Sequence, residues 1–588
     1  MANLSKLWYR DGGFSAEMEI LDRTEKPVIG SGPMLNAYPD SIGGTAGEII
    51  EFFNMPELAS AFQSLYILPS IFNTDLDRGF SVIDYELNEN YASPEDLDAL
   101  KKLGIDLKFD FVLNHASVLS RQFQDIIKNG ENSRYKDFFI NWNKFWEGCG
   151  KMTEEGYIQP EEKYLKNMFF RKPGLPILMV RMPDGKEIPY WNTFYQEVNY
   201  GKIDAQDLMQ VMNIQYTSAE KLAGLVNEAL STGKKPAEID YGRFSARREK
   251  TVELLESRRK YLGQMDLNIK SPLVWEHYEE TLKKLSHYGA RIVRLDAFAY
   301  APKEPGEKNF LNDPGTWDLL ARVKEIAGKY GLSLLPEIHS RYEEKIHEKL
   351  AEQGYMTYDF FLPGLIIDAL ESGSNGFLLQ WIGELREKGI KAVNMLGCHD
   401  GIPLLDLKGL IPDEQIERLI RVIVDRGGYV KDLQGRKNIY YQVNATYSSA
   451  LGDDERKLLL ARAIQIFMPG KPQVWYLDLF AGKNNHEAVE KAGPNGHKEI
   501  NRTNLTLEQV REGLQTDVVR RQLALLRFRN TFPAFGFDAQ LIVSESEPHI
   551  LKLRWENRGC IAVLEANLRD CSFRITAANN RGELLQEI

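Results

Sequence analysis

The chain has 588 residues, of which 43% are hydrophobic and 27% are charged. This length favours one large catalytic domain with appendages, and the composition is that of an ordinary globular protein. Its 73 Lys and Arg against 84 Asp and Glu leave a net charge of -11. Nucleic acids and anionic membranes bind basic surfaces, so the acidic balance argues against both as partners.

The cysteines and the first residues bear on the compartment. The four cysteines, Cys149, Cys398, Cys560 and Cys571, have no metal-site spacing and are too few for a disulfide framework, which favours a reducing compartment. The opening sequence MANLSKLWYRDGG lacks the apolar segment of a signal peptide, and no stretch is long enough to span a bilayer. We therefore expect a cytoplasmic protein.

Eight short apolar segments alternate with amphipathic helical patterns along the chain. Such segments are typical of strands that are buried on both faces of a parallel sheet. Their alternation with helices over this length favours a (β/α)8 TIM barrel over an open sheet. The predicted strands are Met34–Tyr38, Ser64–Leu68, Leu107–Leu113, Arg291–Leu295, Ser333–Leu335, Met356–Phe361, Ala392–Leu396 and Gln473–Tyr476. The predicted helices are Thr45–Phe53, Pro94–Leu103, Trp275–Tyr288, Gly315–Tyr330, Glu343–Gln353, Gly376–Lys388 and Asp454–Phe467.

Two gaps interrupt this alternation. The gap from Asn114 to about Leu267 is too long for a structureless loop and predicts an inserted subdomain. Apolar residues at helical spacing around Leu222–Leu230, followed by the charged helical stretch Arg243–Tyr261, predict a helical hairpin within it. The gap from Gly401 to Leu451 predicts a smaller excursion over the same face of the barrel.

After about Pro533 short alternating segments separated by turn residues predict a C-terminal antiparallel β domain. Its predicted strands are Ala539–Val543, Ile550–Trp555, Ile561–Leu564 and Ser572–Thr576. The expected divisions are an N-terminal extension (1–32), barrel segments (33–113, 267–400 and 452–532), the inserted B subdomain (114–266, with its helical insertion at about 205–262), the second excursion (401–451) and the C-terminal β domain (533–588).

Carboxylates and histidines follow four of the predicted strands. They are Asn114 and His115 after the third strand, Arg294 and Asp296 at the fourth, Glu337 and His339 after the fifth, and His399 and Asp400 after the seventh. Active sites of such barrels lie at the C-terminal ends of the strands, so these side chains are expected to converge. A single carboxylate in such a place is more often a helix cap or an ion-pair partner, but the ordered set favours catalysis.

Paired carboxylates on either side of a scissile bond are what glycoside chemistry requires. Asp296, beside Arg294, is expected to stay ionised and to act as the nucleophile, because a nearby cation favours the charged form. Glu337 follows the apolar stretch Leu334–Pro336, which is expected to raise its pKa and to suit it as the proton donor.

Four segments resemble the signature regions of the α-amylase superfamily, glycoside hydrolase family 13. They are DFVLNH (110–115), RLDA (294–297), EIH (337–339) and HD (399–400). Further segments resemble one branch of it, the sucrose phosphorylases and sucrose 6'-phosphate phosphorylases. They include YPDSIGG (38–44), RGF (78–80), HDGI (399–402), QVNATYSSAL (442–451) and INR (500–502). The likeness extends from about Ala37 to Phe535.

The resemblance implies a role for each matching residue. Asp296 would be the nucleophile, Glu337 the general acid/base and Asp400 the transition-state stabiliser. The glucosyl unit would be held by Asp77, Phe80, His115, Arg294, His399 and Arg502. The acceptor side would be lined by Tyr300, His339, Tyr441 and Gln442, and either Arg171 or Lys172 would help to hold phosphate.

The implied reaction is a double displacement. Asp296 forms a β-glucosyl ester while Glu337 protonates the leaving oxygen, and inorganic phosphate then attacks the ester to give α-glucose 1-phosphate. The resemblance implies no metal and no organic cofactor. The expected partners are an α-glucoside donor and inorganic phosphate, and the expected state is a monomer or a homodimer.

One departure from the branch leaves the acceptor open. Ile439 stands where members of the branch carry an aspartate that contacts the fructosyl unit, and losing such a polar partner changes preference strongly. Fructose, fructose 6-phosphate, glycerol and glycerate therefore remain possible acceptors. Two other classes are an α-glucosidase, in which water replaces phosphate, and a non-catalytic binding barrel. The three carboxylates Asp296, Glu337 and Asp400 disfavour the binding barrel.

Overall fold

The structure, a computed structural model, describes residues 29–171, 174–432, 440–493, 496–579, 581 and 583–587. Eight parallel strands form its central sheet, and all eight predicted strands are present. They are β1 (Met34–Ala37), β2 (Ser64–Ile67), β5 (Asp106–Val112), β13 (Ala290–Asp296), β14 (Ser333–Pro336), β15 (Thr357–Asp359), β16 (Ala392–Met395) and β19 (Lys471–Trp475).

The strand order β14-β13-β5-β2-β1-β19-β16-β15 follows the chain around a ring, with β1 beside β19. The two ends of this order, β14 and β15, also contact each other, so the ring is nearly closed. The predicted (β/α)8 barrel is therefore confirmed. Parallel pairing sets Asp296 beside Val112 and Leu295 beside Pro336, which brings the C-terminal ends of β5, β13 and β14 to one level.

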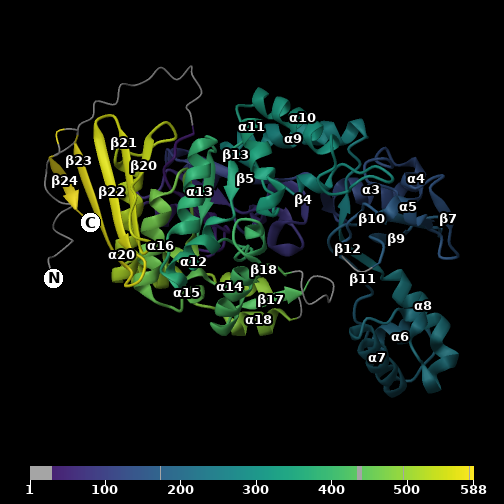
Figure 1. Ribbon diagram of the computed structural model, residues 1–588. Coiled ribbons are helices and arrows are strands. Elements are labelled where there is room, and N and C mark those ends of the chain that lie inside the picture. Colours follow the sequence, from purple (N-terminus) through teal and green to yellow (C-terminus); the bar gives the residue numbers. More distant parts are fainter. Residues whose placement is uncertain are drawn as a thin grey trace.

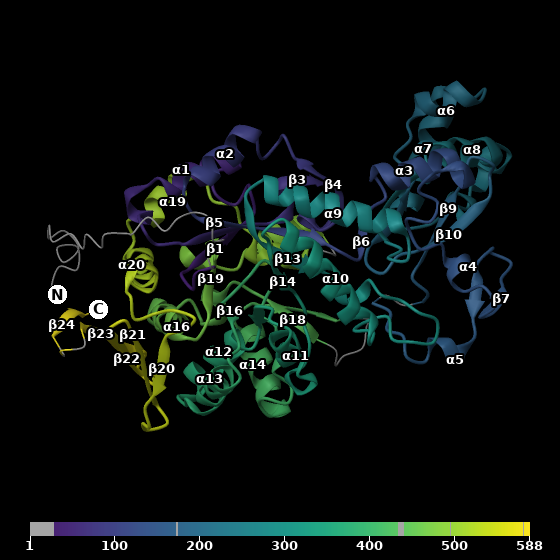
Figure 2. The same ribbon diagram turned by 90° about the horizontal axis from the view of Figure 1, so that it is seen from above.

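Helices surround the strands, as Figure 2 shows from above. The seven predicted helices are found as α1 (Ala46–Phe53), α2 (Pro94–Lys102), α9 (Pro272–His287), α10 (Gly315–Lys329), α11 (Ile346–Glu352), α13 (Gly376–Glu387) and α16 (Glu455–Phe467). One barrel helix was missed, α12 (Leu362–Ser372), whose residues Leu362–Leu370 are all buried. A helix buried all round has no polar face, so its sequence lacks the amphipathic period that reveals a helix.

The inserted subdomain begins after β5. Its outermost part consists of three helices, α6 (Ala205–Val211), α7 (Tyr216–Ser231) and α8 (Arg248–Ser257), rather than the predicted hairpin. They enclose a separate small core that includes Leu208, Leu222, Val226 and Leu255. In Figures 1 and 2 these helices lie at the end of the molecule opposite the C-terminal sheet.

The helix predicted over Arg243–Tyr261 is too long. Residues Lys260–Asp266 form strand β12, which pairs with β11 (Gln196–Asn199) on one side and with β6 (His115–Ser117) on the other. The charged residues Arg258, Arg259 and Lys260 stand where α8 ends and β12 begins, so the sequence gives no apolar signal of the boundary. β12 then carries the chain back to the barrel.

The second excursion contains α14 (Asp413–Asp425) and the antiparallel pair β17 (Tyr429–Asp432) and β18 (Tyr440–Asn444). The C-terminal domain is a five-stranded antiparallel sheet, one strand more than predicted. Its strands are β20 (Gln540–Val543), β21 (Ile550–Asn557), β22 (Cys560–Asn567), β23 (Ser572–Asn579) and β24 (Leu584–Glu587). The Trp555 indole N–H donates to the Phe467 carbonyl at 2.9 Å, which ties this sheet to the barrel. Within the described part of the chain, no helix is long and apolar enough to cross a membrane.

Candidate active site

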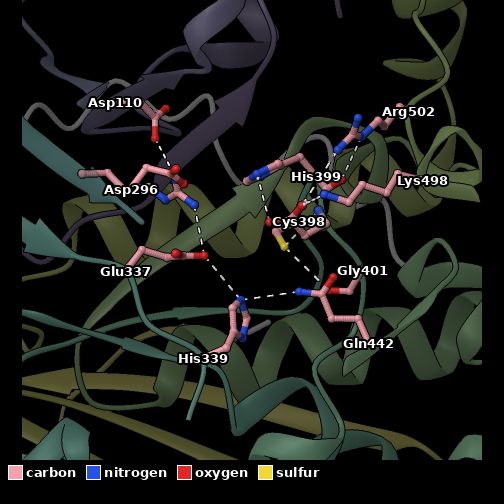
Figure 3. A network of polar contacts seen from close by, with 12 residues as sticks. Asp110, Asp296, Glu337, His339, Cys398, His399, Gly401, Gln442, Lys498 and Arg502 are labelled. Atoms are coloured by element: carbon pink, nitrogen blue, oxygen red, sulfur yellow. Dashed lines mark hydrogen bonds and ion pairs between the residues drawn. The ribbon is translucent and has the colours of Figure 1, made fainter. Parts of the chain in front are cut away.

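Three strand ends bring carboxylates around a single arginine. Asp296 is the last residue of β13, Glu337 follows β14, and Asp110 lies on β5, where it pairs with Arg294 of β13. The Arg294 guanidinium lies 2.5 Å from Asp110 Oδ1, 2.9 Å from Asp296 Oδ1 and 3.1 Å from Glu337 Oε1. The expected convergence of Asp296 and Glu337 is therefore present, and Figure 3 shows both side chains beside Asp110.

The charge distribution within this pair differs from the expectation. Burial raises the pKa of Asp296 to about 7. The nearby Arg294 opposes this rise, and the charge of Glu337 adds to it. For Glu337 burial also acts upward, but Arg294 and His339 outweigh it and hold the pKa down to about 2. The expectation of an ionised Asp296 beside a protonated Glu337 is thus reversed in this structure.

The physical reason lies in contacts that the sequence does not display. Arg294 stands two positions before Asp296 in the sequence, yet its second terminal nitrogen contacts Glu337, so one cation is shared among three carboxylates. His339 Nε2 lies 3.4 Å from Glu337 Oε1 and provides that carboxylate with a further donor. Two cationic partners favour the ionised form of a carboxylate, so the pKa of Glu337 lies below that of Asp296.

Asp400 lies beyond the end of β16 among three cationic or ionisable groups. His399 Nε2 is 3.1 Å from Asp400 Oδ2, while Lys498 Nζ and Arg502 Nη2 lie 2.6 Å and 3.9 Å from Oδ1. Burial opposes ionisation, but His399, Lys498 and Arg502 together hold the pKa of Asp400 well below its ordinary value. Lys498 was missed by the sequence analysis, although it stands four positions before Arg502 in the segment GHKEINR.

Aromatic and polar groups complete the same pocket. The Phe80 ring stacks on His399 with 5.2 Å between centroids, and the Arg294 guanidinium lies 5.3 Å from the Phe80 centroid. His115 Nε2 is 3.0 Å from the Phe80 carbonyl oxygen, and the Arg502 Nε donates to the His399 carbonyl at 2.8 Å. Phe80, His115, Arg294, His399 and Arg502 therefore meet as expected. The side chain of Asp77 lies outside the described residues.

The His339 imidazole lies between Glu337 and Gln442. Its Nε2 faces Glu337 and lies 3.4 Å from Gln442 Nε2, as Figure 3 shows. Its Nδ1 lies 2.8 Å from Asp406 Oδ2, a buried carboxylate that the sequence analysis did not single out. The His339 ring also stacks on Phe360 with 3.9 Å between centroids. His339 and Gln442 thus lie together as expected.

Arg171 and Tyr300, both expected on the acceptor side, contact each other. Arg171 Nη1 donates to the Tyr300 hydroxyl at 3.1 Å, and its guanidinium lies 4.9 Å from the ring centroid of Phe194. Phe194 was missed, although it also packs against His115 at 4.8 Å between ring centroids. Lys172, Ile439 and the side chain of Tyr441 lie outside the described residues, so the choice between Arg171 and Lys172 remains a prediction.

Two clusters bear on metal binding. Lys303 Nζ lies 2.9 Å from Asn114 Oδ1 and 2.8 Å from Asp266 Oδ2, so an ammonium group already occupies this junction of barrel and subdomain. His347, Glu348 and Glu384 offer ligand atoms within 4.8 Å of one another on the outer helices. Lys345 and Lys388 contact the carboxylates of that second cluster, which marks it as an ion-pair network.

Comparison with known proteins agrees with this geometry. Residues 57–167 match the family described as "Alpha amylase, catalytic domain". The chain is 50% identical to the "Sucrose 6(F)-phosphate phosphorylase" of Ilumatobacter coccineus over 92% of this chain and 95% of that protein. It is 31% identical to the "Sucrose phosphorylase" of Streptococcus mutans over 94% and 98% of the two chains.

A solved structure also matches, that of sucrose 6F-phosphate phosphorylase from Thermoanaerobacter thermosaccharolyticum. Its TM-score is 0.77 at 31% identity, with 96% of this chain and 98% of that chain covered. The barrel with its carboxylates at the strand ends defines an enzyme of the α-amylase superfamily. Within that superfamily, the chain belongs to the family of sucrose and sucrose 6'-phosphate phosphorylases, which transfer glycosyl groups.

Proposed function

We propose that the chain catalyses the reversible phosphorolysis of sucrose 6'-phosphate or sucrose with retention of configuration. The products would be α-glucose 1-phosphate and fructose 6-phosphate or fructose. The observation that supports this most strongly is the cluster of Asp296, Glu337 and Asp400 at the strand ends of a chain 50% identical to a named sucrose 6(F)-phosphate phosphorylase.

In the first step Asp296 attacks the anomeric carbon as a carboxylate and forms a β-glucosyl ester. The bond to the leaving sugar oxygen breaks, and Glu337 supplies the proton for that oxygen. In the second step a phosphate oxygen attacks the ester, Glu337 accepts the phosphate proton, and the Asp296 carboxylate is released. The first step therefore requires the proton of the pair to move from Asp296 to Glu337, in the direction opposite to the resting pKa values of about 7 and about 2.

Asp400 is proposed as the stabiliser of the positive charge that develops on the glucosyl ring. The cations around it keep it ionised, and an anion beside an oxocarbenium-like carbon lowers the barrier electrostatically. Phe80, His115, His399 and Arg502, together with the expected Asp77, would bind the glucosyl hydroxyls and ring. Arg294 would hold the Asp296 and Glu337 carboxylates at a fixed separation, because its guanidinium contacts both.

On the acceptor side, Arg171, His339 and the expected Tyr441 would bind phosphate. Charge-assisted hydrogen bonds from these groups would let phosphate outcompete water at the ester. No cofactor takes part in this scheme. The cytoplasm stays the expected compartment, which agrees with the four free cysteines. The absence of an aspartate at Ile439 keeps glycerol- and glycerate-linked glucosides as alternative donors.

The test is the release of α-glucose 1-phosphate from sucrose and from sucrose 6'-phosphate, each with and without inorganic phosphate. Phosphate-dependent release from either donor supports the proposal and names the acceptor. Free glucose in place of α-glucose 1-phosphate would make the chain an α-glucosidase. If neither donor is turned over, the proposal for sucrose and sucrose 6'-phosphate is overturned, and glucosylglycerol and glucosylglycerate are the next donors to assay.

A further inference from the structure

Asp406 is a buried carboxylate to which the resemblance to the family assigns no role. It lies in the short 3-10 helix η10 (Leu405–Leu407) of the second excursion, and its side chain is 6% exposed. An ionised carboxylate in such surroundings requires a cationic or strongly donating partner. The partner that it reaches is His339, with 2.8 Å between Asp406 Oδ2 and His339 Nδ1.

His339 has a carboxylate oxygen at each ring nitrogen. Nδ1 faces Asp406 at 2.8 Å, and Nε2 faces Glu337 Oε1 at 3.4 Å. A neutral imidazole carries one N–H, so it would turn a lone pair toward one of the two carboxylates. The doubly protonated imidazolium satisfies both carboxylate contacts. The Gln442 amide, whose nitrogen lies 3.4 Å from Nε2, would then turn its oxygen toward that N–H. The stacked Phe360 ring, 3.9 Å away between centroids, holds the imidazole plane in place.

We infer that Asp406 is a positioning residue that keeps His339 doubly protonated, so that the acceptor side presents a fixed cation to the incoming phosphate. This inference rests on the proposed phosphorolysis, because it assigns a selectivity device to that same site. A permanent cation binds a phosphate oxygen more strongly than it binds water, since a charge-assisted hydrogen bond has about twice the strength of a neutral one.

The same contact links phosphate binding to the general acid. His339 Nε2–H is one of the two donors that hold Glu337 ionised, the other being Arg294. When a phosphate oxygen accepts the hydrogen bond from this N–H, Glu337 loses that hydrogen bond, and its affinity for a proton rises. The His339–Asp406 pair would therefore favour the protonated form of Glu337 when the acceptor position holds an oxyanion. No proton leaves His339 in this exchange.

Among the described residues, Glu337 and Asp406 are the charged groups with the largest effect on His339. Arg294 acts on Glu337, and Glu344 acts on Asp406. Burial lowers the pKa of His339, but Asp406 and Glu337 outweigh it and raise the pKa to about 10. The imidazolium therefore persists across the neutral range. Without the Asp406 charge only Glu337 still opposes the effect of burial, so the pKa of His339 should fall to near its ordinary value of about 6.5.

The experiment compares Asp406→Asn with a matched control, Asp413→Asn. Asp413 belongs to the same excursion, but its side chain is 65% exposed and pairs with Lys408 on the surface. The rate of phosphorolysis at limiting phosphate and the rate of hydrolysis without phosphate are measured from about pH 5.5 to about pH 9 for both variants and the unchanged chain.

At about pH 8 we expect Asp406→Asn to lower the ratio of phosphorolysis to hydrolysis about tenfold or more, and we expect the ratio to recover toward that of the unchanged chain at about pH 5.5. Asp413→Asn should follow the unchanged chain throughout. A loss of the same size at every pH, or an equal loss in hydrolysis, would assign Asp406 a purely structural role and overturn the inference.

A second measurement does not depend on turnover. Nitrogen-15 NMR of histidine-labelled protein reports the protonation of each imidazole, and His339→Gln identifies the signal of His339. We expect that signal to show a doubly protonated ring at about pH 8 in the unchanged chain and a titration near the ordinary range in Asp406→Asn. Titration near pH 6.5 in the unchanged chain would overturn the inference even if phosphorolysis occurs. A chain inactive on every donor would remove the proposed function, and the NMR titration would still decide the charge of His339.

Discussion

The two halves of the active site are built in different ways. The expected glucosyl half consists of Asp296, Asp400 and His399 at or just beyond strand ends. Arg502, which directly follows the short helix His497–Asn501, completes it. The expected acceptor half takes Arg171 from the inserted subdomain and Gln442 and Asp406 from the second excursion. His339 and Tyr300 follow strand ends. A pocket fixed by the barrel can stay constant while segments on long excursions change, which separates donor recognition from acceptor choice.

The two halves also differ in charge. Around Asp400 the cationic partners outnumber the carboxylate, so Asp400 is firmly ionised. Around Arg294 three carboxylates compete for one guanidinium, and burial raises the pKa of Asp296. In the proposed mechanism the stabiliser Asp400 is therefore ionised in advance, whereas the proposed nucleophile Asp296 has a raised pKa. Three experiments test this contrast.

The largest effect is expected from Asp296→Ala, which removes the proposed nucleophile. Turnover should fall by about 10⁵-fold or more, because the ester intermediate can no longer form. Asp98→Ala is a suitable control, since Asp98 is an exposed carboxylate on α2 whose side chain is 67% exposed. Steady-state phosphorolysis measures both. Activity within tenfold of the unchanged chain would show that Asp296 is not the nucleophile.

Arg171→Ala tests the acceptor half. We expect the KM for phosphate to rise about tenfold or more while hydrolysis of the donor changes little, because a guanidinium that binds phosphate contributes a charge-assisted hydrogen bond. Lys186→Ala removes a cation from the same subdomain at a side chain that is 80% exposed, and it should leave both rates unchanged. If Arg171→Ala slows hydrolysis as much as phosphorolysis, Arg171 supports the fold or the donor, and Lys172 becomes the better candidate.

The smallest effect is one of stability and follows from the raised pKa of Asp296, about 7 against an ordinary value of 3.8. The folded chain keeps this proton between about pH 4 and pH 7, where the unfolded chain releases it. The stability that the group contributes is therefore full below about pH 4 and is lost as the pH rises through 7. Asp296→Asn removes this loss, so its Tm should exceed that of the unchanged chain by on the order of 2 °C or more at pH 8, with little difference at pH 4. An equal difference at both pH values would show that Asp296 is not the protonated member of the pair.

The sequence predicts the parts of the molecule that depend on short-range patterns. The eight barrel strands are apolar segments, and the carboxylates stand directly at their ends, so the positions of Asp296, Glu337 and Asp400 could be inferred. Lys498, Asp406 and Phe194 could not, because each reaches the site from a loop or short helix far away in the sequence. The protonation of Asp296 and Glu337 could not be predicted either, since it depends on the sharing of Arg294 and on the position of His339.

The most direct test of the account is the identity of the residue that carries the glucosyl ester. Glu337→Gln is incubated with α-glucosyl fluoride, whose leaving group needs little protonation, so the ester forms but its breakdown lacks the general base. Peptide mass spectrometry then locates the added hexose. The account predicts the label on the peptide that contains Asp296, with its release on addition of azide. A label on another residue, or no label while the donor is consumed, would contradict it.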